Sequence, residues 1–259
     1  MPEVVQAFVD AKGNVAPVRA IQRDLVTQYE HDIMKYAGSR ALYVKDVFAQ
    51  IPFQLDGNRR RFLLNSINPQ ARFERFKKDF VWLVNAGVGL KTDLVREPKM
   101  ELSDTRQESR FKLFQSDTGM LLSRYGEAMA RATYLDDRKT NLGGVYENVV
   151  AQELAAAGFD LYYYQHSSEG EVDFVMQTQS GAVVPLEVKS GRSPRRHAAL
   201  DHLLASREHQ IPYGVVLSRL NVEVDESARV RYLPLYMTMC FKDFGPAHEV
   251  PLVMQLDGI

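Results

Sequence analysis

The sequence predicts an α/β protein in which a helical amino-terminal part precedes a mixed β-sheet. Apolar residues recur at helical spacing through most of residues 1–85. From Gly143 onward the pattern changes to one helix, three short β-branched or apolar runs, a further helix and a further strand. The chain has 259 residues, enough for two ordinary domains, and we expect them at residues 1–125 and 126–259.

Composition narrows the class of protein. Hydrophobic residues make up 45% and charged residues 25% of the chain, the usual mix for a globular protein. The net charge of −1 means that any nucleic-acid-binding face must be local. The single cysteine, Cys240, excludes an internal disulfide and a cysteine-rich zinc site. No apolar run is as long as a membrane span and the first ten residues lack a signal-peptide pattern, so we expect a cytoplasmic protein without membrane partners.

The amino-terminal part is predicted to be mostly helical. Val4, Val5 and Phe8 lie on one side of a short helix that Gly13 ends. A long amphipathic helix begins near Pro17, and helices follow over 41–50, from the arginines at 59–61, and over 71–85. Ile51-Pro52 is expected to end the second of these helices, because proline disrupts a helix interior.

Two strands, at 90–96 and 111–115, follow these helices around a polar loop. Helices followed by a two-stranded ribbon are typical of a winged helix-turn-helix. The last helix carries basic residues suited to a DNA groove, with the arginines at 59–61 near them. Because Glu74 and Asp79 interrupt this face, packing against another protein domain remains the alternative. The basic residues of the helix are Arg72, Arg75, Lys77 and Lys78.

The sharpest chemical signal lies between residues 143 and 191. Glu187 and Lys189 bracket Val188 in an apolar strand, so their side chains project on the same face. Asp173 is a charged residue in the apolar run of the preceding strand, and a buried carboxylate is costly unless it is paired or binds a metal. Two carboxylates on neighbouring strands suit Mg²⁺ or Mn²⁺, and the lysine would orient water or stabilise charge on a phosphoryl oxygen.

A third acid, Glu147, lies at the margin of the apolar stripe of the preceding helix. Glu153, nearer the middle of that stripe, is its rival. Glu169 or Glu171 would give weaker support to a metal. The alternative interpretation is a solvated strand face, with Asp173 in a turn or paired with Lys189.

The segments E-V-D-F and P-L-E-V-K-S-G, with the helix glutamate upstream, resemble the PD-(D/E)XK nuclease-like superfamily. Over nearly the whole chain, Y-E-H-D-I-M-K and D-T-G-M-L-L also resemble the carboxy-terminal part of a family of bacterial and archaeal AAA-type ATPases. The resemblance implies a winged-helix domain followed by a restriction-endonuclease-like αβββαβ domain. It also implies Glu147, Asp173 and Glu187 as metal-site acids and Lys189 as catalytic lysine.

No G-x-x-x-x-G-K-[ST] motif occurs, so we expect no ATP hydrolysis by this chain alone. The chain then corresponds to a truncated gene, a stand-alone descendant or an expressed fragment, and an ATPase domain is an expected partner. Asp117 is predicted to cap the helix that follows it. His31 and Asp32 of the long helix, and the tyrosines at 162–164, are interpreted as surface and packing residues, not as site residues.

A second basic group follows the lysine. Ser193 and Pro194 are predicted to begin a helix over 195–209. Arg195 and Arg196 would then lie at its positive end, where cations are disfavoured unless an anion binds. With Arg192 they would hold phosphates, or else pair with nearby acids.

Two main hypotheses result. The first is a divalent-metal-dependent nuclease that acts on DNA or RNA. The second is a catalytically inactive module that binds nucleic acid or a partner in an ATPase assembly, and a dimerisation platform is a third. The sequence leaves the choice among them open, because a fold does not fix a function.

Overall fold

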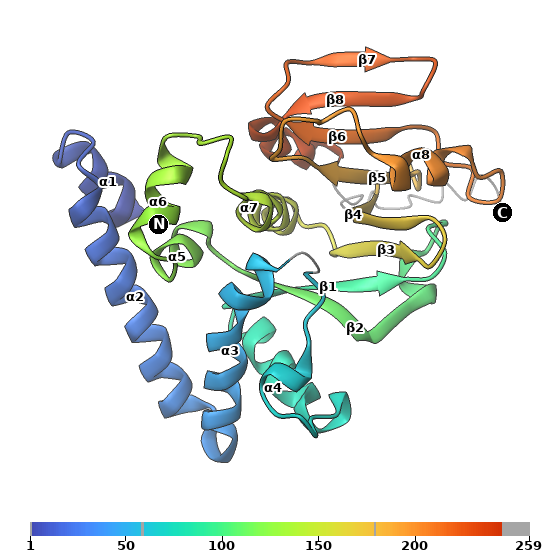
Figure 1. Cartoon of the computed structure of the whole chain (residues 1–259). Helices are drawn as coiled ribbons and strands as arrows, with labels where there is room; N and C mark the ends of the chain where they lie inside the picture. The colour runs from blue at the N-terminus through green and yellow to red at the C-terminus, as the bar shows by residue number, and fades with distance from the viewer. Residues whose placement is uncertain (1, 58–59, 179, 245–259) are drawn as a thin grey trace, which may run out of the picture.

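The structure is a computed structural model that describes residues 2–57, 60–178 and 180–244. A mixed eight-stranded sheet carries helices on both faces, and an amino-terminal group of helices extends away from it (Figure 1). The strand order is β2-β1-β3-β4-β5-β6-β8-β7. The strands are β1 (Gly89–Val95), β2 (Arg106–Gln115), β3 (Tyr162–His166), β4 (Gly170–Gln177), β5 (Val183–Val188), β6 (Gly214–Ser218), β7 (Glu223–Asp225) and β8 (Val230–Pro234).

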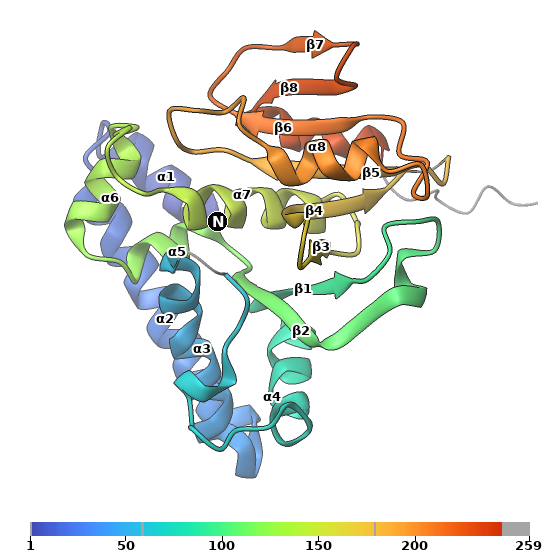
Figure 2. The ribbon, with the colours of Figure 1, turned by 45° about the vertical axis from the view of Figure 1, so that its right-hand side comes forward.

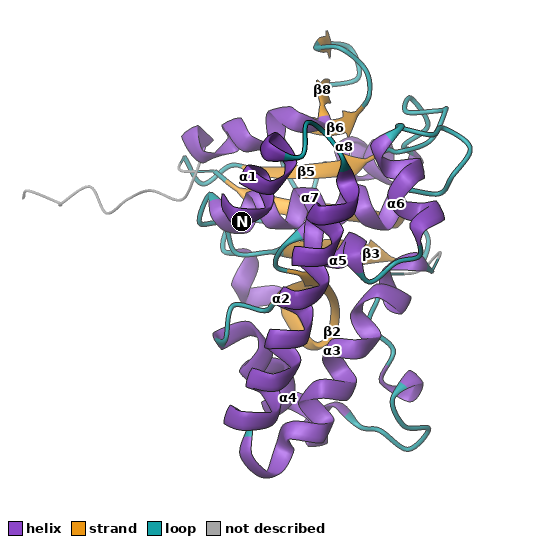
Figure 3. Ribbon diagram, turned by 90° about the vertical axis from the view of Figure 1, so that its left-hand side faces the viewer, coloured by secondary structure: helices purple, strands orange, loops and turns teal. Residues whose placement is uncertain are grey.

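The helices agree with the predicted α/β class. In the amino-terminal part, α2 and α3 pack side by side and point away from the sheet (Figure 3). The α-helices are α1 (Pro2–Asp10), α2 (Val15–Tyr36), α3 (Ala41–Asp56), α4 (Phe73–Asn85), α5 (Thr118–Ser123), α6 (Glu127–Tyr134), α7 (Gly143–Ala156) and α8 (Ala198–Ala205). Short 3₁₀ helices are η1 (Gly38–Arg40), η2 (Leu64–Ser66), η3 (Leu102–Thr105) and η4 (Leu235–Phe244). No helix in the described ranges has both the length and the apolar character needed to span a bilayer.

The predicted two-stranded ribbon is confirmed as β1 and β2, which pair antiparallel. It is not a separate wing, because β1 also pairs in parallel with β3. One sheet therefore runs across the division expected between residues 125 and 126, and side chains from the amino-terminal part reach the carboxy-terminal strands.

Pro52 does not end the second helix, so the boundary predicted at Gln50 is wrong. A proline lacks the N–H that would bond to the carbonyl four residues earlier, here that of Phe48. Arg124 Nη2 donates to this Phe48 oxygen over 2.8 Å. A guanidinium distant in sequence replaces the missing donor, and the helix continues to Asp56.

The prediction of a helix that begins at the arginines 59–61 is also wrong. Arg61 instead forms an isolated antiparallel bridge with Lys112, and the Phe62 N–H donates to the Phe111 oxygen over 2.8 Å. Arg59 lies outside the described residues. The segment thus covers β2 as an extended chain and carries Arg60 toward the sheet.

Two apolar cores lie on opposite faces of the sheet. Residues of α3, α4 and α7 pack with Phe174, Leu186 and Val188 on one face. Leu200 and its neighbours on α8 pack with Val172 and other strand residues on the other face (Figure 2). Leu186 and Val188 therefore share a face, as the alternation of β5 predicts.

A β-bulge in β4 redirects the candidate aspartate. Tyr164 lies opposite Val172 and Tyr162 opposite Val175, so Asp173 and Phe174 together oppose the single residue Tyr163. In a regular strand Val172 and Phe174 would share a face, yet they lie in opposite cores. The bulge thus releases Asp173 from the strict alternation of its strand.

Candidate functional site

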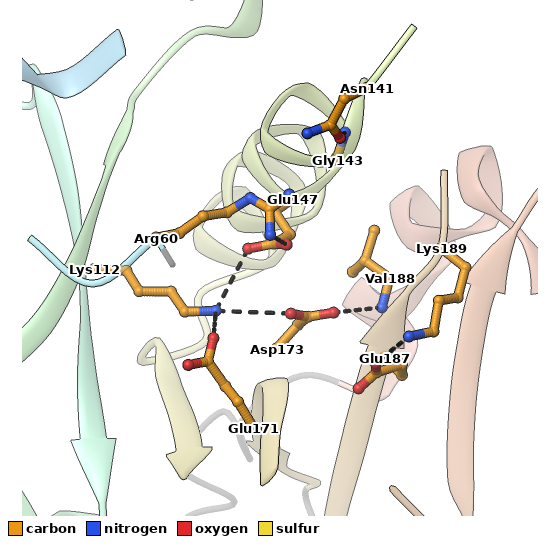
Figure 4. Close-up of polar contacts among 10 residues, drawn as sticks. All are labelled: Arg60, Lys112, Asn141, Gly143, Glu147, Glu171, Asp173, Glu187, Val188 and Lys189. Atoms are coloured by element: carbon orange, nitrogen blue, oxygen red, sulfur yellow. Dashed lines mark hydrogen bonds and ion pairs between the residues drawn. The ribbon is translucent and has the colours of Figure 1, made fainter. Parts of the chain in front are cut away.

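All four predicted catalytic residues line one polar cleft with a cavity volume of about 430 Å³. Helix α7 contributes Glu147, β4 contributes Asp173, and β5 with its continuation contributes Glu187 and Lys189 (Figure 4). Arg60 lines the cleft from the amino-terminal part. The sequence-predicted constellation is therefore brought together at one place.

Glu147 lies in the first turns of α7 and is 2% exposed. Its Oε1 pairs with Arg60 Nη1 at 2.7 Å, and its Oε2 accepts from Lys112 Nζ at 3.4 Å. Burial, with the nearby charge of Asp173, raises the pKa of Glu147 to about 7. The α7 glutamate therefore holds a proton more readily than an exposed glutamate does.

Asp173 is fixed by two neighbours. Its Oδ2 accepts a hydrogen bond from the Val188 backbone N–H at 2.8 Å, which ties β4 to the end of β5. Its Oδ1 lies 3.7 Å from Lys112 Nζ. The alternative pairing of Asp173 with Lys189 is absent among the ion pairs of the described residues, because Lys189 pairs with Glu187.

Glu187 is 6% exposed and has one satisfied oxygen. Lys189 Nζ donates to its Oε1 over 2.5 Å, which confirms that the two side chains share a face. Its Oε2 is buried without a hydrogen-bond partner among the described residues. Burial, reinforced by Asp173, raises the pKa of Glu187 to about 8.

Besides Arg60, which the sequence analysis placed near the basic helix, Lys112 of β2 is a site residue that the sequence analysis missed. Its side chain is fully buried, and its Nζ lies 2.7 Å from Glu171 Oε1 as well as near Glu147 and Asp173 (Figure 4). Burial opposes its charge, but the three carboxylates raise its pKa above the ordinary value. A lysine between two buried apolar residues, in F-K-L, was the available signal.

The other candidate residues from the sequence analysis fall into two groups, inside and outside the cleft. Glu171 lines the cleft, whereas Glu153 and Glu169 are not among the residues that line it. Glu169 instead accepts a hydrogen bond from Tyr164 Oη over 2.8 Å. The tyrosines at 162–164 are buried, and His31 and Asp32 are exposed on α2, so these residues stay outside the site.

The donor set fits a small divalent cation at Asp173 and Glu187. Among the described residues no three Asp, Glu, His or Cys side chains are arranged to hold one metal ion. Mg²⁺ is commonly held by only one or two carboxylates and retains several waters. The unpartnered oxygen of Glu187 is the atom that such a cation would satisfy.

The helix predicted over 195–209 is shorter: α8 begins later and ends earlier, at Ala205, and the prediction that Ser193 and Pro194 begin it is wrong. The structure has α8 start at Ala198 with His197 as N-cap, because 193–196 form a turn closed by the Arg196 N–H on the Ser193 oxygen. Arg195 pairs with Glu223 at 2.7 Å. The exposed arginines of this turn lie outside the lining of the cleft; they are Arg192, Arg195 and Arg196.

The basic residues at the start of α4 are mostly exposed, and one of them contacts α3. Arg72, Arg75 and Lys78 are exposed, and Arg75 Nη2 donates to Tyr43 Oη over 3.1 Å. Asp79 does not interrupt this surface, because it is buried and paired with Arg40. Asp117 caps α5 as predicted, with its Oδ1 accepting from the Met120 N–H over 2.8 Å.

Comparison with known proteins gives two matches to family profiles. Residues 1–129 match the family "Domain of unknown function (DUF8612)" and residues 142–237 match the family "Domain of unknown function (DUF4143)". The second domain often occurs in proteins associated with AAA-type ATPases. No curated protein and no solved structure matches the chain significantly.

Proposed function

We propose that the chain is a divalent-metal-dependent phosphodiesterase of the nuclease type that acts on DNA. The observation that carries the proposal is the second oxygen of Glu187, buried without a partner in a cleft that also holds Asp173 and Lys189. Leaving a buried carboxylate oxygen unsatisfied is costly, and such groups are concentrated at functional sites.

Asp173 and Glu187 would hold Mg²⁺ or Mn²⁺, and the bound ion would supply Lewis-acid polarisation of a phosphate and an acidified water. The Val188 N–H holds Asp173 in place through its hydrogen bond. Lys189 would leave Glu187 for a phosphoryl oxygen and stabilise negative charge there. Glu147, whose pKa is raised to about 7, would exchange a proton with water at the cleft.

The architecture supports this proposal. The order α7, β3, β4, β5, α8, β6, with β5 and β6 parallel, agrees with the αβββαβ order that the resemblance implies, and this agreement supports the proposal. Helices α2 to α4 followed by the β1–β2 ribbon have the element order of a winged helix, although the ribbon here joins the central sheet. The DNA backbone would contact exposed basic residues on α4 and before α8, namely Arg72, Arg75, Lys78, Arg192, Arg195 and Arg196.

The proposal is tested by incubating the protein with supercoiled plasmid and single-stranded DNA in Mg²⁺ or Mn²⁺. We expect cleavage that chelation abolishes and that Asp173→Ala and Glu187→Gln reduce at least hundredfold. Glu153→Gln is the matched control, because this glutamate lies on α7 but outside the cleft. Equal heats of Mn²⁺ binding to wild type and Asp173→Ala would remove the metal site and with it the proposal.

A second candidate is an inactive module that binds nucleic acid or an AAA-type ATPase partner. The buried ammonium of Lys112 favours it, because this group already neutralises acids that a metal-dependent site would use. This candidate predicts DNA or partner binding that survives Asp173→Ala, together with no metal-dependent cleavage.

A further inference from the structure

Lys112 belongs to the amino-terminal part of the chain and contacts, from behind the cleft, three acids that line it. It lies on β2, opposite Thr92 of β1, and the segment with Arg61 bridges to it from outside. The lysine side chain is fully buried, with Nζ 5.1 Å from the centre of the Tyr163 ring. A lysine is almost never fully buried unless it is paired, so its position depends on the acids around it.

Those acids surround one point. Nζ of Lys112 lies 2.7 Å from Glu171, 3.4 Å from Glu147 and 3.7 Å from Asp173. The three carboxylates come from α7 and β4, and the ammonium lies between them (Figure 4). With the ammonium present, no three acids of the described residues are placed as ligands of one metal ion. The three carboxylates converge on the ammonium instead, so it occupies the position where their negative charges would attract a cation.

The charges around the cleft also favour a single divalent ion. Four carboxylates line or adjoin it, and three cationic groups, Lys112, Arg60 and Lys189, pair with them. With all four carboxylates ionised, as metal binding would require, the formal deficit is one positive charge. One divalent ion together with one phosphodiester, which carries a single negative charge, restores neutrality, whereas a second divalent ion would leave an excess of positive charge.

We propose that Lys112 is a built-in cation that takes the position of a second metal ion, so that the cleft holds a single divalent ion at Asp173 and Glu187. This inference rests on the proposed function. It makes Lys112 a positioning and specificity-determining residue: it fixes Glu147, Glu171 and Asp173 and sets the number of metal ions. It also makes the amino-terminal part necessary for the metal site.

The test counts Mn²⁺ bound per chain by electron paramagnetic resonance of the free ion and by isothermal titration. We expect one ion for wild type and two for Lys112→Met, with the second ion lost again in Lys112→Met/Glu171→Gln. Lys77→Met is the matched control, because it removes an equal charge from a surface pair with Glu108, and we expect one ion. Circular dichroism verifies that each variant is folded.

The outcomes separate this inference from the proposed function. One ion in both wild type and Lys112→Met, with unchanged affinity, overturns the role of Lys112 but leaves the metal site intact. No ion in wild type but binding in Lys112→Met supports the built-in cation and overturns the metal-dependent function. No ion in either protein overturns both. If Lys112→Met does not fold without metal, failure of Mn²⁺ to restore its folded circular dichroism spectrum overturns the inference.

Discussion

Gly144 provides the sharpest test of how the fold positions the site. It lies in the first turn of α7, where a Cβ would overlap the Leu55 carbonyl oxygen of α3 and stand 2.9 Å from the carbonyl carbon. Ordinary van der Waals contact begins at 3.4 Å. Because Leu55 would meet the new methyl group with backbone atoms, no side-chain rotation relieves the overlap, and α3 and α7 must separate by about 1 Å to clear the carbonyl oxygen.

We therefore expect Gly144→Ala to destabilise the protein. Overpacking costs about 1–3 kcal/mol, and a backbone clash belongs at the upper end of that range. Alanine regains about 1 kcal/mol over glycine in a helix interior. The net loss is about 2 kcal/mol, or a melting temperature lower by roughly 4–8 °C for a chain of this size. Urea denaturation followed by circular dichroism measures it.

The neighbouring residue is the control. A Cβ at Gly143 would meet only the guanidinium of Arg60 and, at 3.2 Å, the Asn141 side chain, both of which can move. We expect Gly143→Ala to stay within about 1 kcal/mol of wild type, because alanine gains helix propensity while Arg60 shifts. If Gly144→Ala is as stable as wild type, or if both variants lose the same amount, the close α3–α7 contact does not determine stability as argued.

Three further predictions concern charged groups. Lys112→Met should lower the free energy of unfolding by about 3–5 kcal/mol at pH 8, because it leaves buried carboxylates uncompensated. The loss should be smaller at pH 5, where Glu147, whose pKa is about 7, is neutral. Equal losses in urea titrations at both pH values would contradict this. The pKa of Glu187 is raised from 4.5 to about 8, so the stability it contributes is present below pH 4.5 and lost as the pH rises through 8. Glu187→Gln should therefore gain stability relative to wild type between pH 5 and pH 9 in thermal melts, and a constant difference would refute the assignment. Arg40→Met should lower the free energy of unfolding by about 3–5 kcal/mol, because it leaves the buried Asp79 carboxylate unpaired. Asp79→Ala should lower it by only about 1–3 kcal/mol, because the guanidinium of Arg40 reaches water. Chemical denaturation of both variants measures the two losses, and the reverse order would contradict this reasoning.

Local pattern was sufficient for much of the fold, and together with the family resemblance it pointed to the four candidate residues that line the cleft. The alternation of β5 placed Glu187 and Lys189 together, and periodicity placed Glu147 on α7, because both depend only on neighbours along the chain. Prediction from local pattern failed where a group distant in sequence replaced a partner nearby in the chain. Arg124 supplies the donor that Pro52 lacks, and the extended segment at Arg61 pairs with β2 where a helix was expected.

By itself the sequence determined the α/β class and the order of strands and helices around the cleft, and it indicated Asp173 and Glu187, but it left the choice between Glu147 and Glu153 open. Only the tertiary structure decided that β1 and β2 extend the same sheet, that a bulge frees Asp173, and that Lys112 lies among the acids. The physical reason is that burial and charge pairing depend on groups far apart in the chain. The cost of a buried lysine or an unpartnered carboxylate exists only once those groups are assembled.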